Sequence, residues 1–330
     1  MSAILVTGGA GYIGSHAVRA LANLNYQVIV LDNLIYGHKE AIINSSVKFV
    51  EGDISNKSLV TDIIKTYKVE AVMHFAAFAF VGESVTDPSK YYTNNLASSI
   101  AMLDAMREAG CKNIIFSSTC ATYGTPTYMP LDELHPQAPI NPYGASKWML
   151  ERVIKDYHHA YGLNYAFLRY FNASGCSADG LIGEDHTPET HLIPLILKAV
   201  KGERAAITVF GTDYDTPDGT CIRDYIHVED LADAHIKAFT FLLSGKGPVI
   251  CNLGTGTGYS VKEMIDATER VTGKKVPVVF GDRREGDPAV LVANATKAFD
   301  EIGWKAKYTN IEEIITTAWK WEGGERNGRF

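Results

Sequence analysis

The stretch Gly8-Gly9-Ala10-Gly11-Tyr12-Ile13-Gly14 decides the fold of this chain. It follows the short apolar run Ala3–Thr7 and leads into Tyr12–Asn23, where apolar residues recur at helical spacing. The glycines satisfy the pattern G-x-G-x-x-G in its required context of strand, turn and helix. A backbone without side chains can turn tightly and approach a pyrophosphate at the positive end of a helix. The stretch therefore predicts a dinucleotide-binding unit.

The second expected strand, residues 27–31, ends at Asp32, about 18 residues after Gly14. A carboxylate at this position accepts hydrogen bonds from the adenosine ribose hydroxyls and repels a 2′-phosphate. The spacing therefore predicts that the cofactor is NAD rather than NADP.

Short apolar strands and helical patterns continue to alternate along the next part of the chain. We expect strands at 47–50, 71–74, 113–117 and 165–169, and helices at Lys57–Tyr67, 89–109 and 142–160. This alternation predicts an α/β fold with a doubly wound (Rossmann) parallel sheet. Ligands bind outside the carboxyl ends of such strands, where Asp53, Phe75, Ala76 and residues 117–119 fall.

The composition changes at Ala173, after which Gly, Asp, Pro and His dominate through Thr190. We expect an NAD-binding domain at 1–172 and a smaller mixed α/β substrate domain at 173–330. Further helices are expected at Leu192–Lys201, Val228–Leu243, Val261–Thr272, Thr296–Ile302 and 311–321, and strands at 206–210 and Val249–Leu253. The last strand is apolar enough to rejoin the parallel sheet, so segments near 221–254 should return to the first domain.

Bulk composition narrows the class of protein. The 330 residues are 46% hydrophobic and carry a net charge of −7, which argues against nucleic acid as a partner. No apolar run reaches the roughly 18 residues of a membrane span, and no leader is recognisable, so we expect a cytoplasmic protein. The five cysteines show no C-x-x-C spacing and predict neither a disulfide framework nor a zinc site.

Tyr143 and Lys147 carry the expected chemistry. Asn141 and Pro142 resemble a helix start, so Tyr143 and Lys147 should lie one turn apart on one face. An ammonium near the phenol is expected to supply part of a lowering of its pKa, and a positively charged nicotinamide ring more, which suits the tyrosine for moving a hydroxyl proton. Thr119, at a strand end, is expected to hydrogen-bond the same substrate oxygen.

Several longer motifs show a resemblance to a known family. The chain resembles the extended short-chain dehydrogenase/reductases, through the glycine stretch 8–14, Leu31-Asp32-Asn33, His74-Phe75-Ala76, Tyr143-x-x-x-Lys147 and Arg169-Tyr170-Phe171-Asn172. The segments 219–228 and 283–287 are, more narrowly, similar to those of the sugar-nucleotide 4-epimerases of that family. The match covers essentially the whole chain.

The resemblance implies a tightly held NAD and reversible hydride transfer at C4 of UDP-glucose or UDP-galactose through a 4-keto sugar, in galactose metabolism. It implies a homodimer formed through the helices near 89–109 and 142–160. Its implied cofactor-binding residues are Gly8, Gly11, Tyr12, Ile13, Gly14, Asp32, Asn33, Asp53, Ile54, Phe75, Ala76, Asn95, Tyr143, Lys147 and Tyr170. Its implied substrate-binding residues are Thr119, Asn172, His191, Leu192, Phe210, Arg223, Arg284, Asp287 and Leu291.

Two departures from the family pattern leave alternatives open. Ala79 stands where several members have a lysine that contacts the nicotinamide ribose. Leu291 stands where strict glucose/galactose enzymes often have a tyrosine, so UDP-N-acetylglucosamine or UDP-xylose are alternative substrates. A 4,6-dehydratase is disfavoured because Cys120 and Ala121 replace its Asp-Glu pair. A non-catalytic nucleotide sensor is disfavoured because Tyr143 and Lys147 are both kept.

The run Glu184-Asp185-His186 with His191 invites a metal-site hypothesis. Pro188 breaks any helix that would place both histidines on one face, and the spacing matches no zinc pattern. The sequence therefore predicts no metal site.

Overall fold

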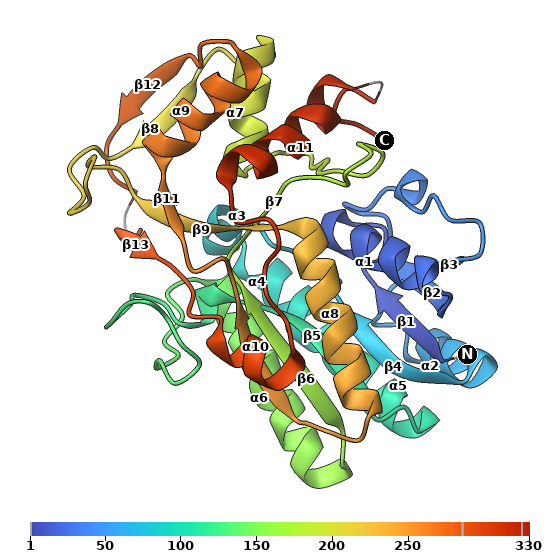
Figure 1. The fold of residues 1–330 in the computed structure, drawn as a ribbon. Coiled ribbons are helices and arrows are strands. Elements are labelled where there is room, and N and C mark those ends of the chain that lie inside the picture. The colour runs from blue at the N-terminus through green and yellow to red at the C-terminus, as the bar shows by residue number, and fades with distance from the viewer. Residues whose placement is uncertain (1, 285–286, 325) are drawn as a thin grey trace.

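The computed structural model describes residues 2–284, 287–324 and 326–330. Its centre is a seven-stranded sheet in which every neighbouring pair is parallel (Figure 1). In spatial order the strands are β10 (Val249–Leu253), β6 (Asn164–Tyr170), β5 (Asn113–Thr119), β4 (Val69–His74), β1 (Ala3–Thr7), β2 (Gln27–Asp32) and β3 (Lys48–Glu51). The predicted doubly wound sheet is confirmed, and Val249–Leu253 does rejoin it.

Alternating side chains of the strands build a hydrophobic core on each face of this sheet. Ile4 and Val6 of β1 pack toward α1 (Tyr12–Asn23) and α8 (Val228–Leu243). Ala3 and Leu5 of the same strand pack toward the opposite layer. That layer contains α2 (Lys57–Tyr67), α5 (Ser98–Ala109) and α6 (Pro142–Tyr161).

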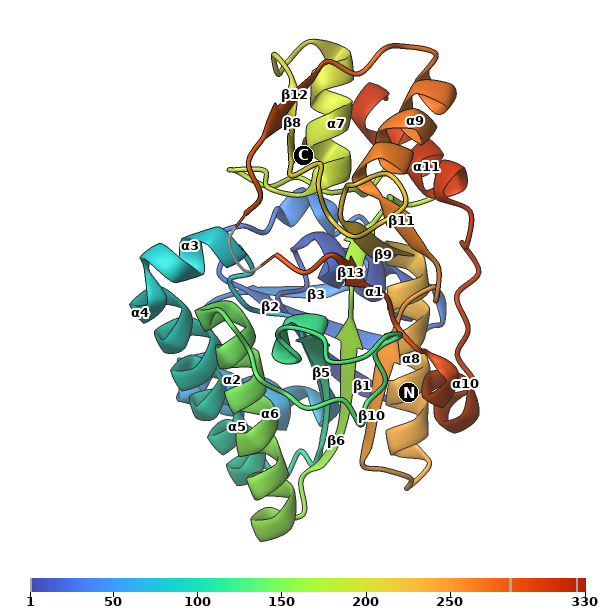
Figure 2. The ribbon, with the colours of Figure 1, turned by 90° about the vertical axis from the view of Figure 1, so that its left-hand side faces the viewer.

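A smaller region covers the carboxyl edge of the sheet (Figure 2). Its own core lies between α7 (Leu192–Lys201), α9 (Val261–Thr272), α11 (Ile311–Gly323) and the parallel pair β8 (Ile207–Phe210) and β12 (Val278–Gly281). Below it a small sheet joins β11 (Gly258–Ser260), β9 (Ile222–His227), β13 (Val290–Leu291) and β7 (Asn172–Ser174). Shorter helical segments are η1 (Lys39–Ala41), α3 (Val81–Thr86), α4 (Pro88–Tyr91), η2 (Tyr92–Ala97), η3 (Cys120–Thr122) and α10 (Thr296–Ile302).

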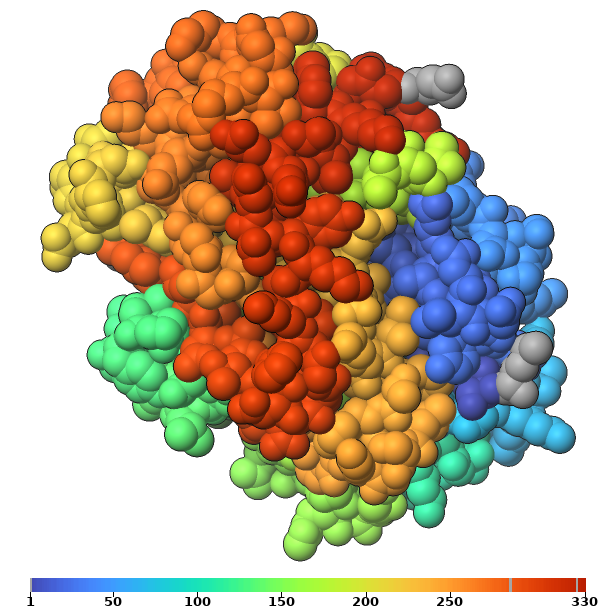
Figure 3. Space-filling view, viewed as in Figure 1, coloured from blue at the N-terminus to red at the C-terminus, as the bar shows by residue number. Residues whose placement is uncertain are grey.

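The two regions interleave along the chain. The segment after β13 returns to the large sheet, where α10 packs against α8 and β10. In Figure 3 this late, red part of the chain crosses one face of the molecule from the upper region to the lower one. None of the described helices combines the length and apolarity that a membrane crossing requires.

The helix predicted at 89–109 is wrong as a single element. It begins earlier, at Pro88, where the Asp87 side chain accepts a hydrogen bond from the Lys90 amide. It then passes from α4 through the π-helical η2 into α5. A π-helical turn holds more residues than an α-helical turn, so it shifts which side chains share a face.

A buried ion pair holds α6 against the sheet. Arg169 of β6 donates to both carboxylate oxygens of Glu151 on α6, at 2.9 and 2.6 Å. Their side chains are only 2% and 1% exposed. Ser118 of β5 and Gln137 donate to the same carboxylate at 2.6 and 3.1 Å. Each oxygen of the buried carboxylate therefore has two donors, which is what makes its burial tolerable.

We predict that Arg169→Met lowers the free energy of unfolding by about 3–5 kcal/mol, because it leaves the Glu151 carboxylate buried without its cation. The double variant Glu151→Met/Arg169→Met should lose less, since no uncompensated charge remains. Urea unfolding followed by circular dichroism measures both. A double variant less stable than Arg169→Met would contradict this explanation.

Candidate active site

A cavity of about 1210 Å³ lies outside the carboxyl ends of the central strands, at the switch point between β1 and β4. A drug-sized ligand site is about 300–1,000 Å³, so this cavity has room for a dinucleotide together with a second ligand. Every residue predicted for the cofactor and the substrate lines it except Asn95. The structure thus brings together residues from both halves of the chain.

The glycine-rich turn packs so closely that side chains are excluded. Gly8 has a φ of +72°, and a Cβ there would meet the Ala76 amide nitrogen at 2.5 Å. A Cβ on Gly14 would meet the Gly8 carbonyl oxygen at 2.2 Å. Gly11 forms the start of α1, and no described side chain caps this helix. The amides at the positive end of α1 therefore remain available to an anion in the cavity.

Asp32 is placed as an acceptor at the end of β2. Its carboxylate accepts hydrogen bonds from the amides of Ala10 and Leu34, both at 2.9 Å. Burial raises the pKa of this carboxyl, and the two amide hydrogen bonds oppose the shift. Beside it, the Asn33 amide donates to Asp53 at 2.8 Å. These polar groups suit the ribose and adenine end of a dinucleotide, and they agree with the sequence prediction.

The acid–base residues lie at the start of α6. The Asn141 side chain accepts a hydrogen bond from the Gly144 amide at 2.8 Å and so begins the helix. Lys147, one turn after Tyr143, donates to the Ser117 carbonyl oxygen of β5 at 3.0 Å. Burial lowers the pKa of Lys147 to about 7. Near neutral pH this side chain can therefore both hold and release a proton.

In the protein without cofactor, the pKa of Tyr143 is raised rather than lowered. Burial raises the pKa of Tyr143 above the usual value, the neighbouring Tyr170 raises it further, and a hydrogen bond with Thr119 opposes the rise. The Lys147 ammonium is directed to the Ser117 carbonyl oxygen instead. The protein by itself therefore keeps Tyr143 as a neutral phenol.

The other half of the cavity carries the arginines. Arg223 of β9 is paired with the carboxylate of Asp287 and is mostly buried. The Arg284 guanidinium lies 4.0 Å from the centre of the Phe210 ring. Leu291 of β13 pairs with Arg223 of β9 in the small sheet. Two guanidinium groups in one cavity wall favour an anionic diphosphate, despite the negative charge of the whole chain.

Asn95 is the one predicted site residue that the structure places elsewhere. It is buried behind the wall, where its side chain accepts from the Phe78 amide at 2.8 Å and donates to Ser146. Its neighbour Asn94 lines the cavity instead. The assignment of Asn95 to the cofactor comes from the family resemblance, and it stays a prediction.

Sequence analysis missed an aromatic part of the wall. Tyr36, Phe78 and Phe80 line the cavity, and Tyr36 contacts both phenylalanines edge-on at 5.4 and 5.2 Å between ring centres. The repeated phenylalanines directly after the end of β4 were the available signal. Phe78 packs with Tyr91 and Tyr143, and Tyr36 lies against the same cluster, so this part of the wall supplies apolar contact on the side of Tyr143.

Three features together define the class of protein as an enzyme that works with a bound dinucleotide. They are the doubly wound sheet, the uncapped N-terminus of α1 and the buried Tyr143–Lys147 pair. The sequence matches the NAD dependent epimerase/dehydratase family over residues 4–254. The UDP-glucose 4-epimerase of Lactobacillus helveticus is 49% identical over 325 residues, which are 98% of this chain and 98% of that protein. This chain therefore belongs to the NAD dependent epimerase/dehydratase family.

Solved structures agree with this assignment. The UDP-glucose 4-epimerase from Brucella ovis, in complex with NAD, has a TM-score of 0.94 at 48% identity, covering 97% of this chain and 98% of that one. The UDP-glucose 4-epimerase from Bifidobacterium longum, in complex with NAD+ and UDP, has a TM-score of 0.92 at 39% identity, covering 99% and 100%. The predicted fold class and family are confirmed.

We predict that Gly14→Ala sharply reduces the NAD retained by the purified protein, because the new Cβ meets the Gly8 carbonyl oxygen at 2.2 Å and must open the turn. Gly82→Ala is the matched control, since Gly82 lines the same cavity but a Cβ there meets nothing within 4 Å. NAD released by acid denaturation is quantified per chain. Equal retention in both variants would contradict the role of the turn.

Proposed function

We propose that this protein is a UDP-glucose/UDP-galactose 4-epimerase that uses a permanently bound NAD. The observation that carries the proposal is that Tyr143, Thr119 and Lys147 share one cavity with the bare start of α1 and with Arg223 and Arg284. Acid–base, dinucleotide and diphosphate chemistry thus meet in a single space. Similarity over nearly the full chain to enzymes named UDP-glucose 4-epimerase supports the same activity.

The residues fit NAD, since side chains are excluded at Gly8 and Gly14 and Asp32 is held as a buried acceptor. In this proposal the pyrophosphate lies at the start of α1, and the adenosine ribose and adenine lie near Asp32, Asn33, Asp53 and Ile54. Held by these residues, NAD would supply reversible hydride acceptance at sugar C4. Because the reaction has no net oxidation, the cofactor need not leave.

Tyr143 moves the hydroxyl proton. It would do so as the phenolate, the form that a protonated Lys147 and a positively charged nicotinamide favour: the phenolate accepts the proton from the sugar 4-hydroxyl as C4 becomes a carbonyl, and the resulting phenol gives the proton back after the sugar has turned over. Thr119, which lines the cavity together with Tyr143, is assigned to hold the same sugar oxygen. Lys147 lies one turn away with its pKa lowered to about 7, so it stabilises the phenolate when protonated.

The substrate's UDP is assigned to the upper half of the cavity. In this proposal Arg223 and Arg284 bind the diphosphate, and Asp287 binds the ribose hydroxyls. Arg223 and Asp287 are already paired across β9 and the segment before β13, which pre-positions both groups. The remaining substrate contacts are Asn172, His191, Leu192, Phe210 and Leu291.

The domain division, the location and the assembly belong to the same proposal. We assign residues 1–172, together with segments near 221–254, to cofactor binding and 173–330 to the nucleotide sugar. We place the protein in the cytoplasm and expect a homodimer through α5 and α6. The exposed apolar residues Trp148 and Tyr161 on α6, which are 38% and 54% exposed, support that interface.

A wider sugar preference is a second candidate, and its support is Leu291. This side chain lines the cavity and is smaller than a tyrosine, so more space is left beside the sugar. Parallel assays with UDP-glucose, UDP-N-acetylglucosamine and UDP-xylose separate the two candidates.

We predict that Tyr143→Phe lowers turnover of UDP-galactose to UDP-glucose by about 100-fold to 10,000-fold, because the proton-transfer group is lost. Tyr67→Phe, at the end of α2 and outside the cavity lining, is the control and should keep full turnover. The assay contains no added NAD and separates the two sugar nucleotides chromatographically. Full turnover in a folded Tyr143→Phe protein would overturn the assignment.

A further inference from the structure

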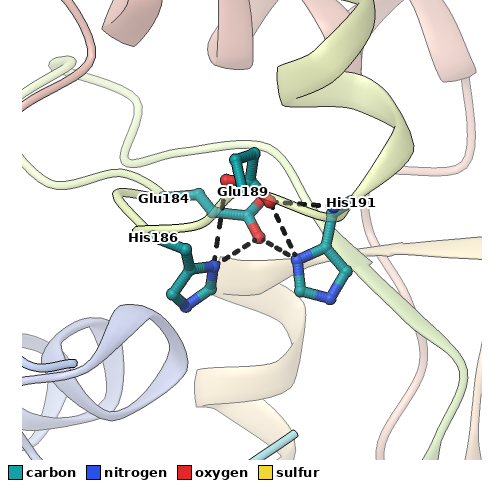
Figure 4. A group of neighbouring side chains, drawn as sticks. All are labelled: Glu184, His186, Glu189 and His191. Atoms are coloured by element: carbon teal, nitrogen blue, oxygen red, sulfur yellow. Dashed lines mark hydrogen bonds and ion pairs between the residues drawn. The ribbon is translucent and has the colours of Figure 1, made fainter. Parts of the chain in front are cut away.

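The loop between β7 and α7 brings four metal-ligating side chains to one place (Figure 4). They are Glu184, His186, Glu189 and His191, and one ligand atom from each lies within 4.8 Å of the others. Pro188 and the lack of a zinc spacing predict no metal here, but the segment is an irregular loop that curls back on itself. The loop gathers side chains that a helix would have separated.

The separations are close to those of a tetrahedral site. Nitrogen and oxygen ligands about 2.0–2.1 Å from a zinc ion lie roughly 3.3 Å from each other at tetrahedral corners. Nδ1 of His186 is 3.2 Å from Oε1 of Glu184 and 3.8 Å from Oε2 of Glu189. Nδ1 of His191 is 2.6 Å from Oε1 of Glu184, so that pair has to separate slightly to admit an ion.

The same four atoms are buried and incompletely satisfied. Oε1 of Glu184, Nδ1 of His186, Oε2 of Glu189 and Nδ1 of His191 are shielded from solvent, and none makes a hydrogen bond of good geometry within the described chain. The Glu184 and Glu189 side chains are only 6% and 4% exposed. Buried polar atoms without hydrogen bonds are costly, and so are two buried carboxylates beside each other.

A divalent cation resolves both costs. Two carboxylates and two neutral imidazoles around an ion of charge +2 form a neutral group, and each of the four atoms gains a ligand bond in addition to its contacts with the others. Imidazole and carboxylate together are a donor set that suits zinc and its first-row neighbours. Simple ion pairing is the alternative, and it requires the imidazoles to be protonated.

We propose that Glu184, His186, Glu189 and His191 bind a structural divalent transition-metal ion of the zinc class. Four protein ligands close the coordination shell, which is typical of a structural rather than a catalytic zinc. The ion fixes a wall of the cavity. The His186 ring packs edge-on against Tyr12 of the cofactor turn and against Phe80, and His191 directly precedes Leu192 at the start of α7.

Metal analysis of the full-length purified protein tests this proposal. The chain is produced in zinc-supplemented medium, freed of loose ions by gel filtration and analysed by plasma mass spectrometry. We expect about one zinc ion per chain. His186→Ala and the nearly isosteric Glu189→Gln should each retain only a small fraction of it. His159→Ala, which removes an exposed histidine on α6, is the control and should keep the zinc.

Two further measurements separate a metal site from an ion-pair cluster. Stripping the wild-type protein with a chelator should lower Tm by about 5 °C, and zinc but not magnesium should restore it. Cobalt(II) added to stripped protein should give the intense visible absorption of a tetrahedral site, and His186→Ala should not. The proposal would be overturned if the wild-type protein took up no zinc and its Tm did not change when the chelator was added. Zinc retained in both variants would also overturn it.

Discussion

The buried ion pair between Glu151 and Arg169 is the constraint on which the site depends. Tyr143, Lys147 and Glu151 follow one another at single-turn intervals on the buried face of α6. Arg169 anchors the last of them to β6, and Ser118 anchors it to β5. Because a helix is stiff over two turns, fixing Glu151 also fixes where Tyr143 and Lys147 meet the ends of these strands.

The Glu151–Arg169 ion pair also explains how one cavity can contain a lysine with a lowered pKa, a tyrosine with a raised pKa and a wall of arginines. Lys147 is buried close enough to the sheet to reach the Ser117 carbonyl oxygen, and burial lowers its pKa. Tyr143 is buried beside Thr119 and Tyr170, and its pKa is raised. Arginines face the cavity from β9 and the segment before β13. Proton transfer and anion binding thus lie on different elements, each held by its own sheet.

Much of this could be predicted from local sequence signals. Spacing along the sequence predicts the turn at Gly8–Gly14, Asp32 and the Tyr143–Lys147 pair. This spacing is the same in the folded and unfolded chain. The role of Asn95 rests on the family resemblance, and its burial in a π-helical turn depends on packing that periodicity does not show. The pKa of Tyr143 depends on burial by distant strands. The clustering of Glu184 with His191 depends on an irregular loop, so neither a helical spacing nor a zinc-ligand spacing in the sequence could predict it.

The most direct test of the central claim follows the hydrogen at sugar C4. If hydride leaves and returns within one closed cavity while Tyr143 moves only the hydroxyl proton, UDP-glucose deuterated at C4 should give UDP-galactose that keeps its deuterium. The reaction is run in ordinary water without added NAD, and the product is read by mass spectrometry and NMR. Retention of deuterium at C4 is the predicted result. Exchange of that deuterium with solvent would contradict the account.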